Sequence, residues 1–197
     1  MKLPKKMLYF DVETTGLNPA VHEIIQLSGI IEWDGQEVDR FDFRVKPRNL
    51  DAIDPKALEV TGLTIEDLEK YPDPDLVFLN LKKTFDRHIN RYDKNDKFIP
   101  VAHNGKFDMD FLNAFFIQNH DPYFGAWVSW NLIDTIAIAR YLFIMNNIPI
   151  ENFKLETLCK YFDIPLKAHD SMNDIVATRE VLYKMNEIFG FEHSRVR

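Results

Sequence analysis

The sequence is poor in cysteine and has no long apolar run, and each absence excludes a class of protein. Cys159 is the only cysteine among 197 residues. A disulfide framework and a cysteine-rich zinc site are therefore excluded, and a reducing compartment is favoured. The apolar run at residues 7–10 is too short for a signal peptide or a membrane span. We therefore expect a cytoplasmic protein that makes no use of a membrane.

An excess of positive charge is also missing. The formal net charge of −7 argues against a protein that coats nucleic acid through bulk positive charge. It is compatible with an enzyme that acts on one phosphodiester bond, because carboxylates that hold divalent cations add negative charge of their own. The chain has no glycine-rich phosphate loop and no internal repeat. Its composition fits a globular protein, and we expect residues 1–197 to form a single domain.

The first predicted elements are three consecutive strands. An apolar run at residues 8–10 leads into two acids, and residues 23–33 form a second apolar strand pattern. The dipeptide Asp34-Gly35 is a strong hairpin signal, and residues 38–45 alternate between apolar and polar side chains. The short connections predict an antiparallel meander. Short helices and loops are expected over residues 47–71.

Helices alternate with short strands in the rest of the chain. Asp73 and Pro74 are typical of a helix start, and that helix is expected to run to about Tyr92. Asn104 is expected to cap a helix that follows a short buried strand. Further elements are predicted as strands at 98–102 and 127–133 and as helices at about 135–145, 155–162 and 171–189. The order βββαβαβαα predicts an α/β fold with a mixed sheet covered by helices.

Four acids and one histidine lie at the ends of these elements. Asp11 and Glu13 are two residues apart on a strand, so their side chains share a face, with Cα atoms about 6.6 Å apart. Asp108 lies one turn into a helix, and Asp174 lies in the first turn of the last helix. We place His169 in the loop before that helix. Each residue also has a structural explanation, such as the helix dipole for Asp108 or helix capping for Asp174.

Together these side chains suit one kind of chemistry. Phosphodiester hydrolysis with two metal ions about 3.5–4 Å apart needs several carboxylates, one of which bridges the ions. A histidine with a pKa near neutrality can accept the proton of the attacking water. Ligands that offer only oxygen favour Mg²⁺ or Mn²⁺ over zinc.

The surrounding motifs add a family resemblance. Residues 10–17 (FDVETTGL), residues 102–108 (AHNGKFD), and His169 with Asp174 five residues later resemble the DEDDh family of 3′→5′ exonucleases, which includes the proofreading epsilon subunit of bacterial DNA polymerase III. The resemblance implies an RNase H-like fold: a mixed five-stranded sheet, three antiparallel strands and then two parallel ones, flanked by helices. It also implies a general base, His169, two Mg²⁺ or Mn²⁺ ions, and four metal ligands, which are Asp11, Glu13, Asp108 and Asp174.

The resemblance further implies where substrate binds. It places Thr14, Thr15 and Leu17 in a pocket for the 3′-terminal nucleotide. Asn104 and Phe107 are implied to lie against the substrate, and a loop that includes Thr61 is implied to close over it. Helical spacing alone favours Phe107 as a core residue. The chain departs from the family pattern at Ser171 and Ile175, and neither departure removes a functional group.

The expected function is removal of nucleoside 5′-monophosphates from the 3′ end of single-stranded nucleic acid, with DNA as the expected polymer. Two alternatives stay open: an exoribonuclease of the same family, and a non-cleaving module of the same fold that binds nucleic acid or a polymerase. The expected partners are 3′ ends of single-stranded DNA or RNA, and a DNA polymerase is the candidate protein partner. The sequence gives no indication of oligomeric state.

Overall fold

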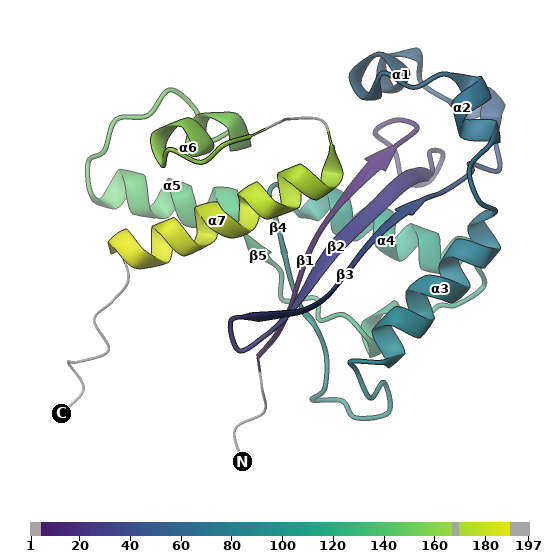
Figure 1. Cartoon of the computed structure of the whole chain (residues 1–197), viewed down its shortest axis with the longest axis horizontal. Coiled ribbons are helices and arrows are strands. Elements are labelled where there is room, and N and C mark those ends of the chain that lie inside the picture. Colours follow the sequence, from purple (N-terminus) through teal and green to yellow (C-terminus); the bar gives the residue numbers. More distant parts are fainter. Residues whose placement is uncertain (1–4, 167–169, 190–197) are drawn as a thin grey trace.

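The computed structural model describes residues 5–166 and 170–189 and contains a mixed sheet of five strands (Figure 1). The strand order is β3-β2-β1-β4-β5. Strands β1 to β3 pair antiparallel, whereas β4 and β5 run parallel to β1. This confirms the predicted RNase H-like sheet. The strand bounds are β1 (Lys6–Thr14), β2 (Ile24–Trp33), β3 (Gln36–Arg44), β4 (Ile99–Ala102) and β5 (Ile133–Asp134).

The hairpin between β2 and β3 forms at the predicted dipeptide. Asp34 and Gly35 have φ angles of 48° and 89°. Two successive positive φ angles are typical of the tight turn whose twist matches that of paired strands. The meander that follows from this turn makes β1 the middle strand of the sheet, with β2 on one side and β4 on the other.

Helices cover both faces of the sheet (Figure 1). Helices α3 and α4 lie on one face, α7 crosses the other face with α5 and α6 beside it, and α1 and α2 stand beyond the end of β1. The bounds are η1 (Leu50–Ala52), α1 (Pro55–Thr61), α2 (Ile65–Glu69), α3 (Pro74–Asp86), α4 (Lys106–Gln118), η2 (Phe124–Ala126), α5 (Thr135–Met145), α6 (Leu155–Tyr161) and α7 (Ser171–Phe189).

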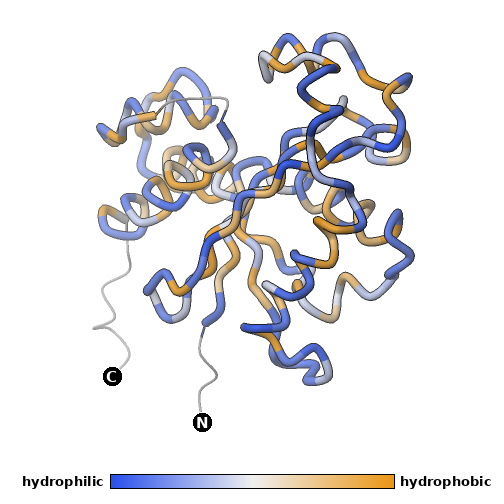
Figure 2. The backbone as a smooth tube through the Cα atoms, turned by 45° about the vertical axis from the view of Figure 1, so that its right-hand side comes forward, coloured by the Kyte–Doolittle hydropathy of each residue, from blue (hydrophilic) through white to orange (hydrophobic). Residues whose placement is uncertain are grey.

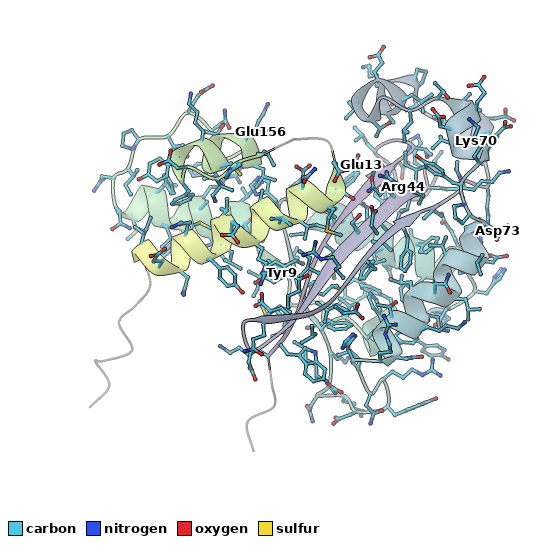
Figure 3. The ribbon with its side chains drawn as sticks, viewed as in Figure 1. Tyr9, Glu13, Arg44, Lys70, Asp73 and Glu156 are labelled. Carbon is cyan, nitrogen blue, oxygen red and sulfur yellow. The ribbon has the colours of Figure 1, made fainter. Side chains whose placement is uncertain are left out.

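The side chains of β1 alternate between two cores. Leu8, Phe10 and Val12 are buried in the larger core, which α3 and α4 complete. Tyr9 faces the opposite way and packs with Ile175 of α7. In Figure 2 the apolar colour follows the strands in the middle of the molecule, and hydrophilic colour is frequent in the peripheral loops. Asp11 and Glu13 continue the alternation of Tyr9, so they lie on the face that α7 crosses.

Two predicted elements end elsewhere. Helix α3 ends at Asp86 and not near Tyr92, because a turned segment follows in which the Asn90 N–H donates to Asp96. The strand predicted at 127–133 is also wrong in extent. Strand β5 has only two residues, and Val128 makes an isolated bridge to Phe98.

The predicted helix cap at Asn104 is wrong as well. Helix α4 has Gly105 at its N-cap without a side-chain hydrogen bond, and Asn104 has a φ of 66°. The N–H groups of Asn104 and Gly105 instead donate to the Asp134 carboxylate, at 3.4 and 3.1 Å. A carboxylate from 30 residues away thus takes the position of the local cap.

No helix in residues 5–166 or 170–189 is long and apolar enough to cross a membrane.

Candidate active site

Three elements bring the four predicted acids together near the end of β1. Asp11 and Glu13 belong to β1, Asp108 to the first turn of α4, and Asp174 to the first turn of α7. Asp108 is only 3% exposed, and its Oδ1 accepts a hydrogen bond of 3.1 Å from the Val12 N–H. The start of α7 is held to the sheet by a contact of 2.5 Å between the hydroxyls of Ser171 and Ser28.

The acids interact electrostatically. Burial raises the pKa of Asp11 well above its ordinary value, and the charges of Asp108, Glu13 and Asp174 raise that pKa further. Burial also raises the pKa of Asp108, to about 7, although hydrogen bonds from the backbone N–H groups of Val12 and Asp108 lower it. Several buried carboxylates close to one another are unfavourable as charged groups. A bound cation would remove that penalty.

The donor set fits hard divalent cations. All four side chains offer carboxylate oxygens, which Mg²⁺ and Mn²⁺ prefer. In the described part of the chain, no group of three or more His, Cys, Asp or Glu side chains is already arranged to hold a metal ion. Like-charged carboxylates repel one another, whereas a shared cation attracts them. We therefore expect these side chains to turn toward an ion when it binds.

Two cavities flank the acids. Helix α1, which lines one of them, and helices α5 and α6, which line the other, stand on opposite sides of the end of β1 (Figure 1). One cavity of about 290 Å³ is lined by residues of β1, of the turn after it, of α1 and of α4. The other, of about 480 Å³, lies on the side of α5, α6 and α7. Glu13 lines the smaller cavity, whereas Asp11 and Asp174 line the larger one. The acids thus stand between two spaces that a chain-like ligand could enter.

Most of the predicted substrate residues gather at the smaller cavity. Its lining includes Thr14, Leu17, Thr61 and Phe107. The Leu17 side chain is 80% exposed, so an apolar surface is available there for a ligand. Thr61 belongs to α1, which comes from a segment remote in sequence from β1.

The other two predicted substrate residues lie elsewhere. Asn104 lines the larger cavity. Thr15 lines neither cavity, is 1% exposed, and its hydroxyl accepts a hydrogen bond of 2.9 Å from the Glu23 N–H. This bond holds the turn between β1 and β2. His169, the predicted general base, lies outside the described residues, so its role stays a prediction.

Several residues at the site carry no motif and were missed. Lys56, Ala57 and Val60 of α1 line the smaller cavity, and Arg140 and Lys154 line the larger one. Nothing in the local sequence distinguishes them from ordinary surface or helix residues. Only the packing of α1, α5 and α6 around the end of β1 could have identified them.

Comparisons with known proteins agree with this geometry. Residues 8–182 match the family model RNase_T, described as an exonuclease. The chain is 32% identical over 185 residues to the PolC-type DNA polymerase III of Halalkalibacterium halodurans, and the match covers 93% of this chain but 11% of that protein. It is 36% identical over 178 residues to the PolC-type enzyme of Oceanobacillus iheyensis, covering 89% of this chain and 11% of the relative. The chain thus spans about a ninth of the length of these relatives.

Solved structures share the fold. The E. coli ExoI complex with single-stranded DNA, in its zinc-bound form, aligns with a TM-score of 0.79 at 20% identity, over 94% of this chain and 41% of that one. E. coli Exonuclease I with a dT13 oligonucleotide aligns with a TM-score of 0.75 at 21% identity, over 94% of this chain and 42% of that one.

Proposed function

Since the chain belongs to the RNase_T exonuclease family, we propose that it is a metal-dependent 3′→5′ exonuclease that acts on single-stranded nucleic acid. DNA is the proposed polymer, and nucleoside 5′-monophosphates are the proposed products. The single-stranded DNA held by the ExoI structures of the same fold supports DNA over RNA. The whole chain is proposed to act as one exonuclease domain.

One observation carries this proposal. Burial disfavours the charged form of Asp11, on the middle strand, and the charges of carboxylates from three elements disfavour it further. A fold gains nothing in stability from four acids at one place, because each like charge disfavours the others. Bound divalent cations would offset the repulsion between these carboxylates. Carboxylates with perturbed pKa values in a cleft are typical of functional sites.

The residues of this chain have separable roles in the proposed reaction. Asp11, Glu13, Asp108 and Asp174 hold the cations, and the Val12 N–H fixes the orientation of Asp108. The smaller cavity receives the terminal nucleoside against Leu17 and Phe107. An imidazole nitrogen of His169 accepts the proton of the attacking water. Two bound divalent cations, Mg²⁺ or Mn²⁺, would promote ionisation of that water and balance the charge of the leaving oxygen.

The PolC-type relatives support a role beside a DNA polymerase, because this chain matches a segment of those larger proteins. A DNA polymerase is accordingly the proposed protein partner. A non-cleaving module is disfavoured, since such a module has no use for four carboxylates that repel one another.

A digest of matched DNA and RNA oligonucleotides, each labelled at the 5′ end, tests the proposal. Mg²⁺ or Mn²⁺ should produce a ladder that shortens from the 3′ end, and chelator should stop it. A 3′-phosphate should block cleavage. Asp108→Asn should abolish turnover, whereas Asp110→Asn should keep it, because Asp110 lies on the same helix but pairs with Lys106 in an exposed ion pair. Full activity in chelator, or cleavage of a closed circular strand, would contradict the proposal.

A further inference from the structure

The larger cavity is lined by both acidic and basic side chains. Asp11 and Asp174 line it together with two cations, Arg140 of α5 and Lys154 at the start of α6. In Figure 1, α5 and α6 stand beside α7 on the side of the β1 end that is opposite α1. A ligand in this cavity would meet the acids at one wall and the basic side chains at another.

The two cations have no acidic partner among residues 5–166 and 170–189. Other basic side chains do pair with an acid, as Arg179 does with Glu32 and Lys82 does with Asp121. Within the described residues, neither Arg140 nor Lys154 forms an ion pair. Glu156 also lines the cavity but does not pair with them. In a chain with a net charge of −7, two unpaired cations at one cavity favour an anionic ligand.

Local contacts hold the Arg140 side chain and the backbone at Lys154 in place. The Arg140 guanidinium carbon lies 5.8 Å from the centre of the Phe153 ring, a distance at which the ring attracts a cation. Asn152 Oδ1 accepts hydrogen bonds from the Lys154 N–H at 3.0 Å and from the Thr157 hydroxyl at 2.7 Å. The turn that presents Lys154 is thus fixed, so less conformational entropy is lost when a ligand binds.

The direction of the nucleic-acid strand across the site indicates which anion the larger cavity would bind. If the terminal nucleoside occupies the smaller cavity, the phosphate to be cleaved lies at the acids. From that phosphate, the nucleic-acid strand continues through the 3′ oxygen of the preceding nucleotide. The larger cavity opens on this other side of the acids. Its volume of about 480 Å³ has room for a nucleotide unit.

We propose that Arg140 and Lys154 form a subsite that binds a phosphodiester on the 5′ side of the cleaved bond. The inference rests on the proposed exonuclease function. The two side chains would then favour longer substrates. An oligonucleotide contacts them, whereas a substrate with one phosphate does not reach them.

Two substrates separate this role from the chemical step. One is a single-stranded DNA oligonucleotide, and the other is the p-nitrophenyl ester of thymidine 5′-monophosphate, which has only one phosphate. The variants are Arg140→Gln and Lys154→Gln. Lys160→Gln is the control, because it removes the same charge from the exposed end of α6 away from the cavity.

The ratio of kcat/KM for the oligonucleotide to that for the ester should fall about 3- to 10-fold in each cavity variant, chiefly through KM. The salt dependence of the oligonucleotide KM should become shallower, by roughly 0.7 in a double logarithmic plot for each lost phosphate contact. Lys160→Gln should keep the parent ratio and slope.

Two results would overturn the inference while leaving the exonuclease function standing. The cavity variants could match Lys160→Gln on both substrates, or they could lose activity equally on the oligonucleotide and the ester. If the parent protein, supplied with Mg²⁺ or Mn²⁺, hydrolysed neither substrate, the proposed function would fail and the inference with it.

Discussion

Asp108 is tied to the middle strand of the sheet, because its Oδ1 accepts a hydrogen bond of 3.1 Å from the Val12 N–H. This bond crosses 96 residues of sequence and joins the first turn of α4 to the strand that carries Asp11 and Glu13. It uses an N–H that lies between the two acids in sequence. The same bond therefore serves the fold and the geometry of the site.

Two substitutions at Asp108 should separate those two roles. Asp108→Asn keeps an oxygen for the Val12 N–H but removes the charge, so the protein should stay folded and lose turnover. Asp108→Ala should also lose about 1–3 kcal/mol of stability, because a buried N–H is left without a partner. Thermal unfolding beside the oligonucleotide digest measures both. Equal stability of the two variants would show that the bond contributes little.

The stability of the metal-free protein should fall as pH rises. The pKa of Asp108 is about 7 in the folded state against an ordinary value of 3.8. A group that binds its proton more tightly when folded stabilises the fold below its unfolded pKa, and that contribution is lost as pH rises through its folded pKa. In chelator, the urea midpoint should therefore decrease from about pH 4 to above pH 7, and Asp108→Asn should flatten this decrease. A midpoint that rises over this range in the parent would contradict the assignment.

Divalent metal should reverse that trend. Cations bind deprotonated carboxylates, so added Mn²⁺ should raise the unfolding midpoint more above pH 7 than near pH 5. Thermal unfolding with and without Mn²⁺ at both pH values checks this. A stabilisation that is independent of pH would place the metal at other groups.

His169 is predicted to act as the base and not as a ligand. His169→Ala should lose about 10²- to 10⁴-fold in turnover, the contribution of a general base. Its affinity for Mn²⁺, measured by isothermal titration, should match that of the parent. Asp11→Asn should lose both turnover and affinity. Loss of Mn²⁺ binding in His169→Ala would make the histidine a ligand.

Arg179 should matter for stability more than for chemistry. Glu32 is 2% exposed and accepts a hydrogen bond of 2.8 Å from Arg179 Nε and another from the Tyr183 hydroxyl. Arg179→Met leaves a buried carboxylate without its cation, so we expect a loss of about 3 kcal/mol. Lys184→Met, which removes an exposed ion pair with Glu187, should change stability by less than about 1 kcal/mol. Chemical denaturation of both variants measures the difference.

Position 29 has no room for a side chain larger than that of glycine. A Cβ there would lie 2.3 Å from Phe41 Cζ, on the neighbouring strand. Gly29→Ala should therefore cost about 1–3 kcal/mol through overpacking. The double variant Gly29→Ala/Phe41→Leu should recover part of that loss, as measured by urea denaturation. If no stability were recovered, the loss in Gly29→Ala would come from the strand backbone and not from a clash with the Phe41 ring.

Local patterns in the sequence predicted most of the elements and the place of each acid within its element. Alternation along β1 was enough to place Asp11 and Glu13 on one face, because neighbouring side chains of a strand point to opposite sides. The bounds of α5 and α7 were predicted correctly from helical spacing and start signals within the segments themselves. These features depend on residues close in sequence, and a sequence shows such relations directly.

Tertiary structure alone decided the surroundings of the acids. Asn104 was expected to cap α4. Instead, the carboxylate of Asp134, 30 residues farther along the chain, accepts hydrogen bonds from the N–H groups at the start of this helix. Arg140 and Lys154 share a cavity with Asp11 only because α5 and α6 pack beside α7 across the end of β1. Such contacts join segments that are 30 to more than 100 residues apart. No local propensity or spacing encodes which side chains meet when separate elements pack together.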